Sequence, residues 1–341
     1  MAASGVAHSA LRIFACEPEW AALAEEIGGD RVKVFTATTP FQDAHHIEAR
    51  PSLIAKVRRA DMLICTGAEL EVGWLPLLLR QSGNDAIQIG QPGYFLAAEV
   101  VDRLEVPERL DRSEGDIHAA GNPHVHLDPR RLLLIAQAFT ERLTLVDPDN
   151  ADWYRARTED FGRRWQQAIH RWQAGSSQLQ GESVVVYHTA FSYLLDWLGI
   201  KAVADLEPKP GLPPTTAHLA KVLATVKSSQ PRAILVASFQ DDKAAAWLAD
   251  RSGLPVIRLP FTVGGDPAAK DLFGLFEITL SLLQGLQSSS RMHPAVPVGL
   301  SDSPRAVASP IRPVNSAQLH LRPQKTTGDL VSPFSSGRSG V

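Results

Sequence analysis

The chain has 341 residues, a formal net charge of −3 and an apolar share of 44%. A single hydrophobic core seldom serves more than about 300 residues, so this length predicts two lobes. The slight negative charge excludes the basic surface with which proteins hold nucleic-acid phosphates, and no nucleic-acid partner is expected. The sequence also contains no apolar run of the roughly 18 residues that a membrane-spanning helix requires.

The first ten residues, MAASGVAHSA, are mostly small and apolar. Residues 1–10 are interpreted as the remnant of a signal peptide, with 7–10 around an A-x-A-like cleavage point. The charged start and most of the apolar segment of a signal are missing, so a ragged terminus is the open alternative.

The first part of the chain alternates strands with helices of about ten residues, which is typical of a parallel sheet built from crossover units. Residues 11–146 are therefore predicted to form an N-terminal α/β lobe. Glycines and prolines interrupt residues 85–128, which are expected to be irregular, with 111–121 as a mobile surface lid. The expected strands are 11–16, 32–38 and 62–66, and the expected helices are 17–27, 51–60, 70–81 and 129–145.

Residues 147–175 are predicted to form one long spine helix that links the two lobes. An acidic and proline-containing start and a glycine at the end mark its limits. About 26 residues at a rise of ~1.5 Å give a rod of roughly 39 Å. A long surface helix of a single domain is the alternative. The helix carries one apolar stripe at helical spacing, formed by Tyr154, Phe161, Trp165, Ala168 and Trp172.

Residues 176–287 repeat the strand and helix alternation and are predicted to form a C-terminal α/β lobe. The fold class is thus α/β, with two lobes that each contain a parallel sheet flanked by helices. Residues 288–341 lack a periodic apolar face and are predicted to be a disordered, dispensable tail. The expected strands of the second lobe are 183–187, 202–206, 233–237 and 256–259, and its helices are 190–198, 215–228, 241–252 and 267–286.

Three short histidine motifs lie where a strand ends or a helix begins: 43–52 (DAHHIEARPS), 121–129 (GNPHVHLDP) and 186–191 (VYHTAF). The carboxyl ends of strands are where open α/β sheets bind ligands. Neutral imidazole suits Zn, Cu, Ni or Fe, and three imidazoles from separate loops can hold one ion. The alternative for each residue alone is an ordinary, partly buried histidine.

These motifs, together with 60–71 (ADMLICTGAELE) and 187–200 (YHTAFSYLLDWLGI), resemble the zinc/manganese group of metal-specific solute-binding proteins of ABC importers. The resemblance covers residues 11–286 and implies His45, His124 and His188 as metal ligands. It implies a periplasmic, monomeric protein that captures Zn²⁺ between two lobes and delivers it to an ABC permease with its ATPase. The 16–20 (CEPEW) and 111–124 (DRSEGDIHAAGNPH) segments are similar to a subgroup that receives zinc from a periplasmic metallochaperone.

A closed tetrahedral zinc site needs a fourth donor. Many members of the family supply an aspartate after the last strand, where this chain has Val263. Asp266 is the first choice because Gly264 and Gly265 would let that loop approach the metal, and Asp271 is the runner-up. We expect His118 to be an accessory residue that captures zinc, with an incidental loop histidine as the alternative.

Three histidine ligands favour zinc over manganese, since hard cations prefer oxygen donors. Two further imidazoles, His46 and His126, stand beside the expected ligands. No catalysis is expected. The rival hypotheses are a zinc hydrolase with Glu48 as base, an adhesin, and an α/β protein without metal, although neither an HExxH helix nor a GxSxG elbow is present.

The two cysteines, Cys16 and Cys65, end the first and third predicted strands. Neighbouring strands lie about 4.8 Å apart, and a disulfide requires Cα atoms about 4.4–6.8 Å apart. A disulfide, which an oxidising periplasm would permit, and two buried free thiols are both open.

Overall fold

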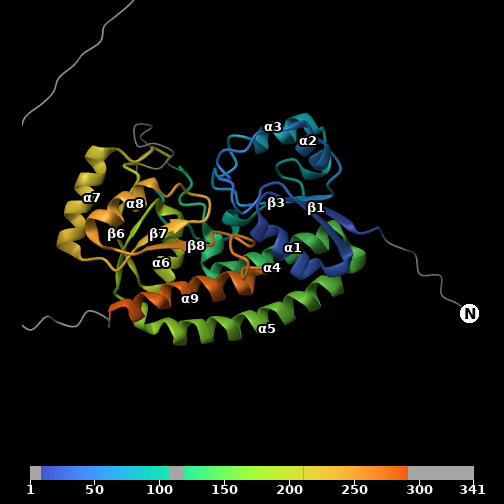
Figure 1. Ribbon diagram of the computed structural model, residues 1–341. Coiled ribbons are helices and arrows are strands. Elements are labelled where there is room, and N and C mark those ends of the chain that lie inside the picture. Colours follow the sequence, from blue (N-terminus) through green and yellow to red (C-terminus); the bar gives the residue numbers. More distant parts are fainter. Residues whose placement is uncertain (1–8, 108–117, 210, 291–341) are drawn as a thin grey trace, which may run out of the picture. The chain divides into compact units, whose positions relative to one another are not determined.

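The computed structural model describes residues 9–107, 118–209 and 211–290, with side chains described to residue 285 (Figure 1). Most of the expected signal remnant, most of the expected lid and residues 291–341 of the expected tail lie outside these ranges. The last helix continues to Ser290, so the chain is helical over the first residues that were assigned to the tail.

The N-terminal sheet has four parallel strands in the order β2-β1-β3-β4. Its fourth strand was not predicted, because three residues are too few for a periodic pattern. Pro92 and Gly93 precede this strand, and a Cβ on Gly93 would lie 2.5 Å from the carbonyl oxygen of Ala86. The strands are β1 Leu11–Ala15, β2 Val32–Thr36, β3 Met62–Cys65 and β4 Tyr94–Leu96.

The helices of this lobe agree with the expected positions except at one boundary. Helix α3 begins at Leu75 rather than at residue 70, because residues 70–74 form turns and Pro76, which lacks a backbone N–H, stands in the first turn of the helix. The helices are α1 Pro18–Gly28, α2 Pro51–Arg58 and α3 Leu75–Ser82.

The C-terminal sheet repeats the same parallel order as β6-β5-β7-β8. The chain therefore changes winding direction at β1 and again at β5, and the carboxyl ends of these strands are where such sheets bind ligands. The strands are β5 Ser183–Val186, β6 Lys201–Asp205, β7 Ile234–Ala237 and β8 Val256–Leu259, and the helices are α6 Ser192–Leu198, α7 Thr216–Ser229, α8 Lys243–Ser252 and α9 Leu272–Ser290.

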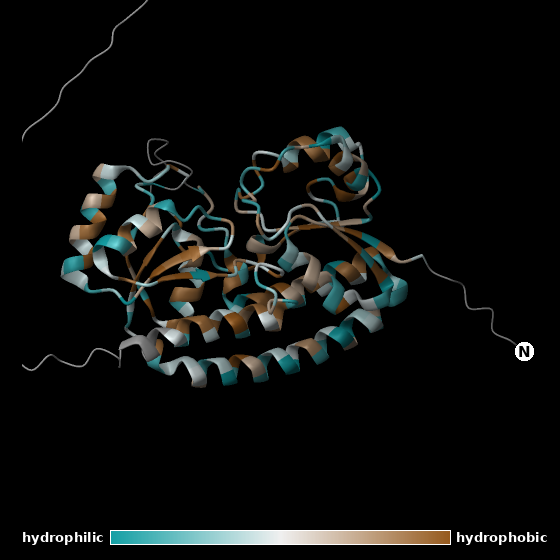
Figure 2. Ribbon diagram, in the orientation of Figure 1, coloured by the Kyte–Doolittle hydropathy of each residue, from teal (hydrophilic) through white to brown (hydrophobic). Residues whose placement is uncertain are grey.

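Helix α5, Ala151–Ser176, is the predicted spine, and it follows α4, Pro129–Val146. Its apolar stripe is buried, and the helix packs against α1, α4 and α9, so it contacts elements from both halves of the chain (Figure 1). Figure 2 shows apolar and polar residues alternating along α5, with apolar residues concentrated in the strands. None of the helices in the described ranges has the length and apolar content to cross a bilayer.

One hydrophobic cluster runs from the first sheet to the second through the spine. It joins Ile13 of β1, Trp165 of α5 and Leu235 of β7 in a continuous set of buried side chains. Because packed cores resist deformation, we expect metal binding to order local loops more than to drive a wide hinge motion.

Cys16 and Cys65 form a disulfide between the ends of β1 and β3, with Cα atoms 4.8 Å apart. β1 and β3 are hydrogen-bonded neighbours, as a doubly wound order requires. The bridged alternative is therefore confirmed, and both cysteines of the chain are paired.

Candidate metal centre

Four imidazoles converge between the carboxyl ends of the two sheets. His45 follows β2, His118 and His124 come from the segment before α4, and His188 follows β5. The ring centre of His45 lies 5.1 Å from the ring centre of His118, 5.8 Å from that of His124 and 6.3 Å from that of His188. The rings of His124 and His188 are 6.0 Å apart. The structure thus brings together the three expected ligands and the expected accessory residue.

These separations are close to those around one tetrahedral ion. Imidazoles bound through Nε2 at ~2.0–2.1 Å would have their ring centres roughly 5 Å apart and their Nε2 atoms about 3.3 Å apart. The Nε2 atoms of His45 and His118 are 3.0 Å apart. The ring centres are thus near the tetrahedral spacing, but no three of the four histidines have ring nitrogens all within 4.8 Å of one another among the described residues, so the rings would have to move closer together to hold one ion.

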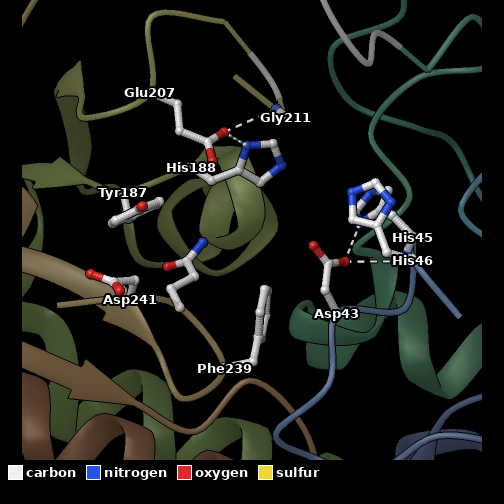
Figure 3. A pocket seen from close by; sticks show the side chains of 10 residues that line it. Asp43, His45, His46, Tyr187, His188, Glu207, Gly211, Phe239 and Asp241 are labelled. Atoms are coloured by element: carbon white, nitrogen blue, oxygen red, sulfur yellow. Dashed lines mark hydrogen bonds and ion pairs between the residues drawn. The ribbon is translucent and has the colours of Figure 1, made fainter. Parts of the chain in front are cut away.

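Carboxylates hold two of the rings from behind (Figure 3). Nδ1 of His45 lies 2.6 Å from Oδ1 of Asp43, and Nδ1 of His188 lies 3.0 Å from Oε2 of Glu207. The Glu207 carboxylate also accepts the backbone N–H of Gly211 at 3.1 Å. A carboxylate on Nδ1 fixes the tautomer that leaves Nε2 free as a metal donor.

Asp43 also shows the electrostatic effect of this pairing. Burial alone would raise its pKa, but the hydrogen bond from the side chain of His45 and the charge of that ring lower it overall. The carboxylate therefore stays ionised and continues to accept the Nδ1 hydrogen of His45.

His124 is the most deeply buried member of the group. Its side chain is only 2% exposed, and neither ring nitrogen has a hydrogen-bond partner among the described residues. Burial, and then the nearby rings of His45 and His188, hold its pKa well below the usual value. A buried, neutral and unpartnered imidazole is costly unless it has a further partner, and a metal ion at the centre of the four rings would supply one.

His118 is partly buried, and its Nε2 lies 3.0 Å from Nε2 of His45. Burial, and then the rings of His45 and His188, lower its pKa to about 4, while a hydrogen bond to the backbone carbonyl of Ala68 opposes this shift. His118 therefore lies beside the ring of His45, although the sequence suggested only an accessory role. The lid that was expected around it lies largely outside the described residues.

The two aspartates expected as fourth ligands make local contacts instead. The Asp266 carboxylate accepts the N–H of Ala268 at 2.8 Å, and Asp271 accepts the N–H of Gly274 at 2.7 Å. Asp271 thereby serves the first turn of α9, which explains why that helix begins later than predicted. Neither residue lines the two cavities that border His45.

Two cavities meet at His45 and His46. The first has a volume of about 210 Å³ and includes Tyr187, His188 and Glu207 in its lining. The second, of about 350 Å³, includes Glu69 and His118. Figure 3 shows the first cavity, with residues of the N-terminal half on one side and residues of the C-terminal half on the other. The centre is therefore reached through space bordered by both halves.

The spare imidazole His126 has a structural position. Its Nε2 lies 2.9 Å from the carbonyl oxygen of Phe261, and its Nδ1 lies 3.3 Å from the carboxylate of Glu19. The hydroxyl of Thr262 donates to the same carboxylate at 2.5 Å. This buried set ties α1 to the loop after β8, behind the metal centre.

Asn122 connects the segments that carry His124 and His188. Its side-chain amide donates to the carbonyl of Thr189 at 2.8 Å, while its Oδ1 accepts the backbone N–H of His124 at 2.9 Å. The Asn-Pro-His motif thus positions one histidine relative to the other across the two halves. Sequence reasoning missed this role, as it missed those of Asp43 and Glu207, although Asp43 stands within the first histidine motif.

Changing the carboxylates behind the rings should weaken metal binding without abolishing it. We expect Asp43→Asn and Glu207→Gln each to lower the zinc affinity by about 10–100-fold, the usual cost of losing an outer-shell partner. Chelator competition would measure the change. Asp241→Asn is the control, because Asp241 lines the same cavity without a recorded bond to a histidine. An equal loss in all three variants would indicate a general charge effect.

Comparison with known proteins agrees with this architecture. Residues 13–284 match the model of the family described as "Zinc-uptake complex component A periplasmic". The fold and the site define a metal-binding component of an uptake system. The chain belongs to the zinc-uptake component A family.

Individual relatives are distant. The chain is 25% identical over 215 residues to the high-affinity zinc uptake system protein ZnuA of Bacillus subtilis, which covers 62% of this chain and 66% of the relative. It is 25% identical to the zinc-binding lipoprotein AdcA of Streptococcus pneumoniae over 60% of this chain and 41% of AdcA. It is 22% identical to the manganese ABC transporter substrate-binding lipoprotein PsaA of S. pneumoniae, over 73% of this chain and 78% of PsaA.

Thus the chain spans just under two thirds of one zinc relative and less than half of another.

Among solved structures, a crystal structure of ZnuA superposes with a TM-score of 0.67 and 20% identity over 81% of this chain and 99% of that chain. A manganese-bound periplasmic metal-binding protein from Candidatus Liberibacter asiaticus superposes with a TM-score of 0.67 and 17% sequence identity, over 81% of this chain and 99% of that chain. At these identities the structures establish the fold.

Proposed function

We propose that this protein captures Zn²⁺ between its two lobes and delivers it to an ABC permease with its ATPase. The observation that carries the proposal is the convergence of His45, His118, His124 and His188 from both halves of the chain. Imidazole nitrogen suits zinc, and four imidazoles that close around one ion would form a tetrahedral site.

The donor set favours zinc over manganese. Imidazole suits Zn²⁺, whereas Mn²⁺ sites are richer in carboxylate and water. Asp43 and Glu207 lie behind the rings rather than at the centre, so they do not convert the site into an oxygen-rich one. We propose His118 as the fourth ligand in preference to Asp266 and Asp271, whose carboxylates bind neighbouring backbone N–H groups.

A periplasmic location is consistent with the Cys16–Cys65 disulfide, because such bonds persist in oxidising compartments. The protein is proposed to act as a monomer. A zinc metallochaperone is a further proposed partner, resting on the similarity of the segment around His118 to a subgroup that receives metal in this way.

The hydrolase alternative is not favoured. A catalytic zinc site keeps an open coordination position, whereas four histidines fill a tetrahedral shell. Glu48 lies in the loop after β2 and is not among the residues that line the cavities bordering His45.

The test is a titration of chelator-treated protein with Zn²⁺ and Mn²⁺. One tightly bound zinc per chain is expected, with manganese displaced by zinc. In parallel, His118→Ala should weaken zinc binding by about tenfold or more, with water taking the vacated position, whereas Asp266→Ala should leave it unchanged. Preferential manganese binding would overturn the choice of metal. A larger loss of zinc affinity in Asp266→Ala than in His118→Ala would overturn the ligand assignment.

A further inference from the structure

Two carboxyl groups lie buried at the carboxyl ends of β1 and β3, away from the four histidines. Glu17 follows Cys16 and is 4% exposed, while Glu71 is 2% exposed. A carboxylate oxygen of Glu71 and both sulfur atoms of the disulfide lie within 4.8 Å of one another. Buried acidic groups are rare unless they have specific partners, so the partners of this pair indicate its role.

Glu71 accepts two backbone hydrogen bonds. Its Oε1 lies 2.7 Å from the N–H of Thr66, and its Oε2 lies 3.0 Å from the N–H of Gly67. Such a fork requires two acceptor oxygens, which only the ionised carboxylate offers in full. Glu17 lies beside it: burial and then the charge of Glu71 raise its pKa well above the usual value, so Glu17 keeps its proton, and its Oε2 accepts a hydrogen bond from the hydroxyl of Thr66 at 3.1 Å.

The backbone fixed by Glu71 adopts an unusual conformation. Gly67, Ala68 and Glu69 have φ angles of 79°, 47° and 67° in succession. A left-handed conformation is unfavourable at a non-glycine residue and persists only where the surroundings enforce it. A Cβ on Gly67 would lie 2.9 Å from Cβ of Leu96, so the turn also packs closely on β4.

This turn contacts the segment that carries His118. The carboxylate of Glu69 accepts the backbone N–H of Ala119. Glu69, one of the three left-handed residues, therefore holds the neighbour of His118, and the conformation of the turn determines where this acceptor lies.

We propose that Glu71 is a positioning residue for metal binding: by fixing the left-handed turn 67–69, it places the Glu69 carboxylate that holds Ala119 and so orients the adjacent His118 toward the other three histidines. The inference rests on the proposed role of His118 as the fourth ligand. Loss of the carboxylate fork allows the turn to relax, and His118 then leaves the metal more readily while the other three ligands remain.

The groups around Glu71 make this effect depend on pH. Burial raises the pKa of Glu71, although its bonds from Gly67 and Thr66 oppose the shift. Glu71 interacts with Glu17, the other member of the pair. The further ionisable groups that interact with the pair are Glu19 of α1 and Tyr94 of β4. As the pH falls, Glu71 gains a proton and one acceptor position is lost, so the parent should come to resemble a variant that lacks the carboxylate.

The test compares zinc dissociation rates of full-length Glu71→Gln, Glu17→Gln and the parent by transfer to a chromogenic chelator. Glu71→Gln should release zinc about tenfold faster than the parent, as expected for an outer-shell partner. Glu17→Gln is the matched control. Because Glu17 is already neutral and the oxygen of its amide replacement can still accept the hydroxyl hydrogen of Thr66, the zinc dissociation rate of this variant should stay within about twofold of the parent rate. From about pH 8 to about pH 6, the ratio of the Glu71→Gln rate to the parent rate should fall toward one.

The same two changes in a His118→Ala background separate positioning from general destabilisation. There Glu71→Gln should change the rate by less than about twofold, because effects that act through one residue are not additive. An undiminished effect in that background, or equal effects of Glu17→Gln and Glu71→Gln, would overturn the inference. Glu71→Asp, which retains the charge but is too short to reach both N–H groups, is measured as well and should behave as Glu71→Gln does.

These outcomes are distinct from failure of the proposed function. A parent protein that binds no zinc would remove both proposals. A His118→Ala variant that binds zinc like the parent would remove the four-histidine assignment and, with it, the role of Glu71. If His118→Ala weakens binding but Glu71→Gln matches the parent, only the positioning role is wrong.

Discussion

Replacing His124 with alanine should weaken zinc binding by more than about 100-fold, beyond the about 10–100-fold that an outer-shell partner costs. Both ring nitrogens of His124 are buried without a partner among the described residues, and its ring lies beside those of His45 and His188. Removing it leaves a void at the most enclosed corner of the site. His45→Ala and His188→Ala should follow closely, because each removes a nitrogen whose orientation a carboxylate has already fixed.

The measurement is chelator competition on chelator-treated protein, with His46→Ala as the matched control. His46 is the sequence neighbour of His45 and lines the same cavities, with its ring centre 6.1 Å from that of His45. Its loss should change the affinity only a few-fold. If His45→Ala, His124→Ala and His188→Ala all bound zinc like the parent, the functional assignment would be wrong.

The fold was largely predictable because most of its elements carry strong periodic signals. Buried parallel strands such as β5 and β7 are short apolar runs, and the stripe of α5 repeats at helical spacing over 26 residues. The exceptions arise from local geometry that composition does not encode. β4 is stabilised by its pairing with β3, and α3 begins late because residues 70–74 form turns before Pro76, which stands in the first turn of the helix.

Only the part of the candidate site that lies in recognisable sequence motifs could be predicted. His45, His124 and His188 stand in motifs beside strand and helix ends, and topology then brings these ends together. The position of His118 depends on how an irregular segment folds back onto Ala68 and His45, which no sequence pattern specifies. The expectation for Asp266 rested on its place in a loop, and a carboxylate in a glycine-containing loop can equally bind the backbone N–H groups beside it, as it does here.

The outer-shell residues are harder still to predict. Glu207 follows β6 and reaches His188 across the end of the sheet, so the pairing depends on strand order rather than on sequence distance. Glu17 and Glu71 looked like ordinary helix and turn residues. Their burial follows from the approach of β1 to β3, which the order β2-β1-β3-β4 requires and which a sequence pattern alone leaves undetermined.

Removing the Cys16–Cys65 disulfide should lower the free energy of unfolding by about 4 kcal/mol. The bridge closes a loop with a sequence separation of 49 residues, and the loss of loop-closure entropy in the unfolded chain gives this magnitude at 25 °C. The bridge also links the carboxyl ends of β1 and β3, the two central strands of their sheet. Paired replacement by alanine and denaturant unfolding of the metal-free protein would measure the change, since bound zinc would itself stabilise the folded state.

The parent measured with and without a thiol reductant is the control, because reduction opens the bridge without deleting the sulfur atoms. Both comparisons should show a loss of several kcal/mol, and the alanine pair should lose somewhat more because two buried side chains become smaller. Titration of the denatured, unreduced parent should find no free thiol. A loss below about 1 kcal/mol in both comparisons would mean that the bridge contributes little beyond the packing of β1 against β3.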